Sequence, residues 1–212
     1  MTGIMESFEL AFRMQTAVPD VVSMADETKQ TQEMYGLDQP ETKEYGRQLL
    51  ISRRLVERGV RFVQVYHGGD NNAGRWDAHK SLKSNHARTC KQVDRPIAAL
   101  LKDLKQRGLL DETLVVWGGE FGRTAYCQGN LTSENYGRDH HPRCFTVWLA
   151  GGGIRKGITY GQSDDYGYNI ADADGNPLTP QPSKEAWTPG TMHIHDLNAT
   201  ILHLLGIDHR RL

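Results

Sequence analysis

The chain has 212 residues, of which 38% are hydrophobic and 24% are charged, a composition typical of a globular domain with an apolar core. Its 25 basic and 26 acidic residues leave a formal net charge of −1, which argues against nucleic acid as a partner. No signal-peptide pattern and no apolar run of membrane-spanning length is present, so the sequence predicts a soluble protein with no export signal and no membrane partner. Neither a cell compartment nor an oligomeric state follows from these features.

The first half of the chain is expected to begin irregularly and then to form regular elements. Residues 1–40 are polar and interrupted by proline and glycine, with room for a short amphipathic helix over residues 7–15. A firmer helix is predicted from about Glu41 to Arg58, where apolar residues recur at helical spacing. The apolar run Val60–Tyr66 then predicts a strand.

The second half alternates a helix and strands. A helix is expected from about Ala87 to Arg107, followed by strands over Thr113–Trp117 and Phe145–Ala150 and a last helix from Leu197, capped by Asp196. Strand, helix, strand order predicts a right-handed crossover between parallel strands. The expected fold class is therefore α/β: a single domain built as a three-layer α/β/α sandwich with a mostly parallel sheet.

Acidic and histidine side chains collect in the loops between these elements. Asp77 and His79 are one residue apart, so both can face one ion if the loop is extended. Carboxylate and neutral imidazole suit zinc or manganese and, with more oxygen donors, magnesium or calcium. We therefore predict a site for divalent metal ions, with zinc favoured. The pair alone leaves another interpretation open, in which Asp77 caps the next helix and His79 is solvated.

The next loop carries Glu120 and Arg123. Glu120 follows a predicted buried strand and is flanked by glycine, which leaves room for an ion close to the backbone. Arg123 can then bind an anionic substrate oxygen bidentately. An ordinary salt bridge between the two residues is the alternative, and the two interpretations are compatible.

Three consecutive potential ligands, Asp139, His140 and His141, follow Arg138 in the same loop. Because neighbouring residues of an extended segment point opposite ways, one imidazole is expected to reach the metal and the other to act as its partner or as a general acid. A purely structural cluster is the alternative. The predicted metal ligands are Asp77, His79, Glu120, Asp139, His140 and His141. The predicted catalytic residues are His140 and Arg123, and the predicted substrate-binding residues are Arg138 and Arg123.

Further motifs follow one another in a specific order along the chain. They are Trp117–Thr124, Gly137–Pro142, Ala150–Ile154, His195–Leu197 and Leu204–Asp208. In this order they resemble the bacterial family called "domain of unknown function 1501". That family is related to the alkaline phosphatase and sulfatase superfamily, whose members use two metal ions to cleave phosphate or sulfate esters. The resemblance implies an alkaline-phosphatase-like fold and a metal-dependent hydrolase that acts on a small anionic ester.

The resemblance also implies roles for particular residues. Asp77 and His79 match the aspartate and histidine that bind one metal, and His140 or His141 falls where the last histidine ligand is expected. At the other metal, Glu120 and Phe121 stand where the superfamily carries Asp and His. Relatives begin with a strand that supplies an aspartate ligand and a nucleophile, which residues 1–40 do not resemble. The chain is therefore expected to be the C-terminal part of a longer domain, and the alternative function is a truncated or degenerate metal-binding module without turnover.

Overall fold

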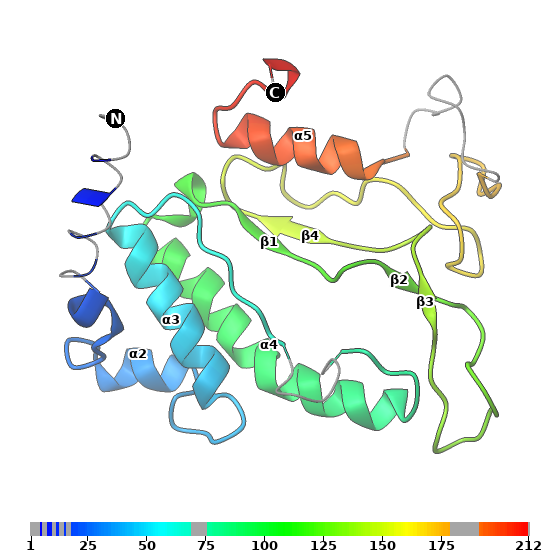
Figure 1. Ribbon diagram of the computed structural model, residues 1–212, viewed down its shortest axis with the longest axis horizontal. Helices are drawn as coiled ribbons and strands as arrows, with labels where there is room; N and C mark the ends of the chain where they lie inside the picture. Colours follow the sequence, from blue (N-terminus) through cyan, green and yellow to red (C-terminus); the bar gives the residue numbers. More distant parts are fainter. Residues whose placement is uncertain are drawn as a thin grey trace. The chain divides into compact units, whose positions relative to one another are not determined.

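The computed structural model shows helices joined by long loops, together with two short pairs of antiparallel strands (Figure 1). It describes residues 18–68, 76–178 and 191–211, with Met5, Phe8, Glu9, Phe12 and Gln15. The helix predicted over residues 7–15 falls in part outside this set. Residue contacts divide the chain into two compact units, Met1–Gly69 with Arg88–Arg107 and Asp70–Ala87 with Gly108–Leu212. The single domain over the whole chain stays a prediction.

Helices make up most of the first unit. Thr28 caps the short helix α2 (Lys29–Met34) by accepting a hydrogen bond from the Thr31 amide at 3.0 Å. Helix α3 (Lys43–Glu57) confirms the helix predicted over 41–58, and α4 (Leu82–Gln106) confirms the next one but begins earlier than expected. Among the described helices, none combines the length and apolarity needed to cross a membrane.

The core of the first unit lies along one face of α4. Its buried residues Val93, Pro96 and Ala99 recur at helical spacing, and Leu104 continues the same face. On α3, Gly46 comes so close to the carbonyl of Tyr35 that a Cβ atom at this position would clash with it. Apolar periodicity therefore determines which helix face is buried, while glycine at position 46 lets the backbone of α3 approach that of Tyr35.

The second unit contains all of the described strands. Strand β1 (Val115–Trp117) pairs antiparallel with β4 (Trp148–Ala150), and their rings stack where Trp117 lies opposite Trp148. Strand β2 (Gly122–Arg123) pairs antiparallel with β3 (His140–His141). Helix α5 (Ile194–Leu204) follows, and the described residues also form the 3-10 helices η1 (Leu110–Glu112) and η3 (His209–Arg211).

Helix α5 starts before the predicted position, so the prediction that Asp196 is its N-cap is wrong. His193 is the N-cap, and its Nδ1 accepts a hydrogen bond from the His195 amide at 3.2 Å. Asp196 occupies the third helical position and accepts from the His193 amide at 2.8 Å. This reciprocal capping box satisfies two backbone donors of the first turn and gives both residues a structural role.

The predicted α/β/α sandwich with a parallel sheet is wrong. Within the described residues, both strand pairs are antiparallel, and Val60–Tyr66 forms no strand. Phe62 is 70% exposed and Tyr66 is 73% exposed, so this apolar run does not enter a core. Because the first strand of the expected crossover is missing, α4 joins no parallel pair. Instead, the long polar loop between β1 and β4 reverses the chain.

Candidate metal centre

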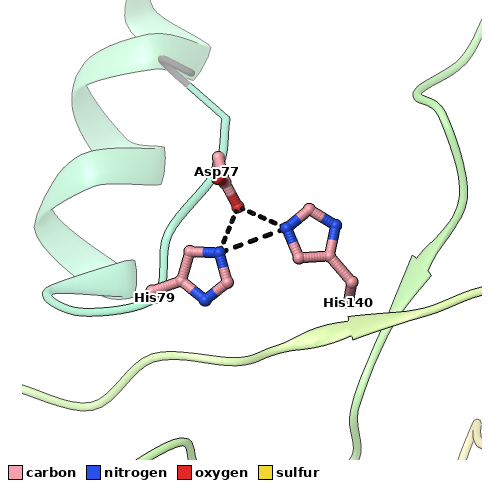
Figure 2. A group of neighbouring side chains, drawn as sticks. All are labelled: Asp77, His79 and His140. Carbon is pink, nitrogen blue, oxygen red and sulfur yellow. Dashed lines mark hydrogen bonds and ion pairs between the residues drawn. The ribbon is translucent and has the colours of Figure 1, made fainter. Parts of the chain in front are cut away.

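Three side chains of the second unit point their metal-binding atoms at one another (Figure 2). The Nε2 atoms of His79 and His140 are 3.1 Å apart. The Oδ1 atom of Asp77 lies 2.9 Å from His79 Nε2 and 3.3 Å from His140 Nε2. Two nitrogens and one oxygen therefore form a small triangle at a partly exposed surface, since Asp77, His79 and His140 are 26%, 35% and 37% exposed.

The loop that carries Asp77 and His79 is held by the segment before β3. Ala78, which lies between the two, is buried, while both of its neighbours are partly exposed. The Ala78 carbonyl accepts from the Arg138 amide at 3.0 Å. A Cβ atom on Gly137 would clash with the His79 backbone. Glycine at this position therefore permits the contact that brings His79 to His140.

Strand pairing places His140 and turns His141 away from the triangle. Arg123 of β2 lies opposite His140, and Gly122 lies opposite His141. The ring of His141 stacks on Tyr168 at 3.7 Å, and its Nε2 donates to the Tyr168 carbonyl at 2.5 Å. As expected for neighbours on a strand, the two imidazoles face opposite sides, and His140 is the one that meets Asp77.

The opposite nitrogen of each triangle histidine also has a partner. The Nδ1 atom of His140 lies 2.9 Å from Glu120 Oε1, and Phe121 packs edge-on against the same ring. The Nδ1 atom of His79 contacts Gln128 Oε1. Both rings are thus held at two points, which fixes their orientation.

Arg123 contacts the triangle through Asp77. Its Nη1 donates to Asp77 Oδ1 at 2.6 Å, while its Nη2 lies 3.7 Å from Glu120 Oε1. Partial burial opposes ionisation of Asp77, but the hydrogen bond and charge of Arg123, with the two imidazoles nearby, lower its pKa below the ordinary value of 3.8. The carboxylate therefore stays ionised at neutral pH, in the form that metal ions bind.

The other predicted site residues lie around the triangle. Asp139 is half-exposed, and its Oδ1 accepts from the His140 amide at 2.8 Å while lying 3.8 Å from His79 Nδ1. Arg138 is exposed, and the structure records no side-chain partner for it among the described residues. The predicted ligands thus divide into three that converge, two that flank them, and His141 on the far side of β3.

Sequence reasoning missed Gln128 and the close approach at Gly137. Gln128 lies in a polar loop, 49 residues from the histidine that it contacts, and no local pattern marks it. Gly137 offered a weak signal, since a glycine directly before a cluster of ligands indicates close backbone approach. Both residues contact the His79 loop only in the folded protein, because they lie far from it in the sequence.

Comparison with known proteins identifies the family and nothing narrower. No curated protein and no solved structure matches the chain. The relation to the alkaline phosphatase and sulfatase superfamily and the expected truncation stay predictions. A family model described as "Protein of unknown function (DUF1501)" matches residues 1–212, which confirms the predicted family. The chain belongs to the DUF1501 family.

Proposed function

We propose that this protein is a divalent-metal-dependent hydrolase of small phosphate or sulfate esters, with the metal held by Asp77, His79 and His140. The triangle formed by Asp77 Oδ1 and the two Nε2 atoms carries this proposal, with edges of 2.9, 3.1 and 3.3 Å. Atoms that bind one zinc ion at about 2.0–2.1 Å are about 2.9–3.4 Å apart at octahedral to tetrahedral angles. The three donors therefore fit a single ion without rearrangement.

The donor set also fits a catalytic site better than a structural one. Structural zinc sites are closed by four protein ligands, whereas catalytic sites use three and leave a position for water or substrate. Here the three donors belong to partly exposed side chains, so solvent and substrate can reach them. A bound divalent ion supplies Lewis-acid stabilisation of the oxygens of an ester and lowers the pKa of a water molecule.

The residues of the chain have separate tasks in this proposal. Asp77, His79 and His140 hold the ion, so the predicted role of His140 as a general acid gives way to that of a ligand. Arg123 keeps Asp77 ionised and oriented through its 2.6 Å hydrogen bond. The exposed guanidinium of Arg138, two residues before His140, is the group that we assign to binding the ester anion.

Motif resemblance supports the choice of ester chemistry. The segments around Asp77 and Glu120 are those that resemble the alkaline phosphatase and sulfatase superfamily. We propose this kinship on the motifs alone, because the described residues form no parallel sheet. The metal donors, rather than the fold, therefore support the hydrolase.

Metal analysis combined with an assay of hydrolysis tests the proposal. The purified protein is loaded with zinc or manganese, its metal content is measured, and aryl phosphate and aryl sulfate are offered as substrates. We expect one equivalent of metal and metal-dependent release of the phenol. His79→Ala and His140→Ala are expected to lose both, whereas His203→Ala, an exposed histidine on α5, is expected to keep them.

Each other outcome has a definite meaning. Substoichiometric metal that the two histidine variants do not change would refute the metal site. Stoichiometric metal without hydrolysis of either ester would refute the hydrolase and support a metal-binding module without turnover. Tight binding of ferrous iron without hydrolysis would also contradict the proposal, since two histidines and one carboxylate form the site of non-haem iron oxygenases.

A further inference from the structure

The two histidines of the triangle meet through the same kind of atom. His79 and His140 both present Nε2 to Asp77, and the two Nε2 atoms are 3.1 Å apart. A pair of neutral imidazoles at this distance would ordinarily form a hydrogen bond, in which one Nε2 donates and the other accepts. The other nitrogen of each ring, Nδ1, has a partner of its own on the opposite side.

Each Nδ1 atom faces an oxygen that can only accept a hydrogen bond. Glu120 Oε1 lies 2.9 Å from His140 Nδ1, and Gln128 Oε1 contacts His79 Nδ1. An ionised carboxylate and an amide oxygen carry no proton, so each can accept a hydrogen bond from an N–H at Nδ1. Asp77 Oδ1 faces both Nε2 atoms and is an acceptor too, so it is a bound metal ion that requires Nε2 to be free of a proton. A neutral imidazole has a single N–H, and with its proton on Nδ1 it keeps a lone pair on Nε2.

With both rings in this form, all three atoms of the triangle are electron-pair donors. Both Nε2 lone pairs and the ionised Oδ1 of Asp77 lie within 3.3 Å of one another. Three electron-rich atoms this close repel one another unless a cation or shared protons lie between them. By contacting Nδ1 from outside the triangle, Glu120 and Gln128 favour the form of the two histidines that a metal ion binds.

The geometry also gives Glu120 a role other than the one predicted from the sequence. Its carboxylate contacts Nδ1 of His140, on the side of the ring away from the triangle. A carboxylate behind a metal-binding histidine orients the ring and strengthens its lone pair as a donor. Gln128 orients His79 in the same way but brings no charge, so the effect of Glu120 is expected to be the larger.

We propose that Glu120 and Gln128 are positioning residues that contact Nδ1 of the two histidines and so direct both Nε2 atoms at one metal ion. This inference rests on the metal site of the proposed function but not on hydrolysis. Glu120 is 56% exposed, so its removal is not expected to unfold the chain.

Nitrogen NMR of the histidine rings, combined with zinc titration, tests the proposal on the full chain. In the zinc-bound protein, we expect His79 and His140 to bind the ion through Nε2 and to carry their proton on Nδ1. Glu120→Ala and Gln128→Ala should release the ring that each residue contacts and weaken zinc binding by about 10–100-fold each. Zinc affinity is measured by competition with a coloured chelator, so activity plays no part in this measurement.

Conservative variants separate positioning from a general structural effect. Glu120→Gln and Gln128→Glu each keep an oxygen acceptor, so both are expected to retain the Nδ1–H tautomer and most of the zinc affinity. Glu134→Ala removes an exposed carboxylate from the same long loop and is the matched control, with unchanged affinity expected. A thermal melt of each variant shows whether it is folded, and Gln128→Ala carries the test if Glu120→Ala is not folded.

Two results would overturn the inference. One is zinc bound through Nδ1 of either histidine in the wild type, and the other is unchanged zinc affinity in Glu120→Ala and Gln128→Ala. Either result can occur in an active hydrolase. Conversely, a wild type without ester hydrolysis whose variants lose zinc affinity as expected would refute the proposed function and leave the positioning roles intact.

Discussion

Each compact unit contains a cluster of ionisable side chains, and the two clusters differ in what their members present to one another. In the first unit, Arg53 and Arg54 of α3 meet carboxylates from other segments, so that opposite charges touch. In the second unit, His79, His140 and Asp77 turn electron-pair donors toward a common point. The first arrangement pairs cations with anions, whereas the proposed metal site leaves its cation to be supplied by a ligand.

Burial separates the two clusters further. Only 2% of the Arg53 side chain is exposed, and its guanidinium contacts three carboxylates: Glu27 at 2.7 Å, Asp103 at 2.9 Å and Glu57 at 2.5 Å. Asp103 also accepts a hydrogen bond from the buried Tyr35 hydroxyl at 3.0 Å. Burial and the charge of Asp103 both raise the pKa of Tyr35, so the hydroxyl stays a donor. Buried charges that are paired in this way hold segments of the fold together.

This difference shows how a structural cluster is told from a candidate binding site. Groups that stabilise a fold satisfy one another, and little of their surface remains exposed. In the proposed metal site the donor atoms stay accessible, and Glu120 and Gln128 contact the outer nitrogen of each histidine.

The largest expected effect is the loss of the buried cation. Arg53→Met keeps a long apolar stem but leaves the carboxylates of Glu27 and Asp103 without this partner. The free energy of unfolding is therefore expected to fall by about 3–5 kcal/mol. Urea unfolding measures it, with Arg155→Met as a control for loss of an exposed arginine. A loss no larger than that of the control would show that the network contributes nothing to the fold.

Removal of a triangle histidine is expected to leave the stability of the metal-free protein almost unchanged. His140→Ala should change the free energy of unfolding by no more than about 0.5 kcal/mol without zinc, because the ring is partly exposed and faces other donors. At a free zinc concentration of about 100 times Kd, the wild type should gain about 2.7 kcal/mol and the variant almost none. Thermal melts with and without zinc measure the difference. Equal stabilisation of both proteins by zinc would remove the distinction between the clusters.

Helices with strong apolar periodicity were predictable, whereas the strand pairing was not. The sequence located α3 and α4 because several turns repeat the same buried face. Val60–Tyr66 has strand-like composition, but a strand also needs a hydrogen-bonding partner, which composition does not reveal. The direction of β1 relative to β4 depends on the path of the long loop between them, which carries no periodic signal.

The candidate site was predictable as a set of residues but not in its contacts. Spacing suggested that Asp77 and His79 share a side, and strand alternation separated His140 from His141. That Glu120 contacts the outer nitrogen of His140 follows from ring orientation, which the sequence does not encode locally. The network around Arg53 escaped prediction for a similar reason, since Glu27 and Asp103 lie 26 and 50 residues away.

A smaller effect is expected from pH in the buried network. Burial opposes ionisation of Glu27, but hydrogen bonds and charges from Arg53 and Arg54 outweigh it and lower its pKa below the ordinary value of 4.5. A lowered pKa stabilises the fold above the unfolded value of about 4.5, and this contribution is lost as the pH falls through the folded value. Glu27→Gln should therefore lower the free energy of unfolding by about 1–3 kcal/mol at pH 7. The difference from the wild type should narrow below about pH 4.5 in urea titrations. A difference that stays constant down to pH 3 would show that the charge of Glu27 is not what matters.

The smallest effect is expected where the same pairing occurs at the surface. Lys91 of α4 and Glu41 form an ion pair of 3.1 Å within the first unit, but their side chains are 70% and 48% exposed. Water screens such a pair and the side chains lose mobility, so Lys91→Met should change the free energy of unfolding by no more than about 0.5 kcal/mol. The same urea titration measures it at low and high salt. A loss comparable to that of Arg53→Met would mean that pairing alone stabilises this unit. A negligible loss would show that burial causes the difference in stability between Arg53→Met and Lys91→Met. Each of the two variants removes one cation from a pair that joins α4 to another segment, so pairing is common to both.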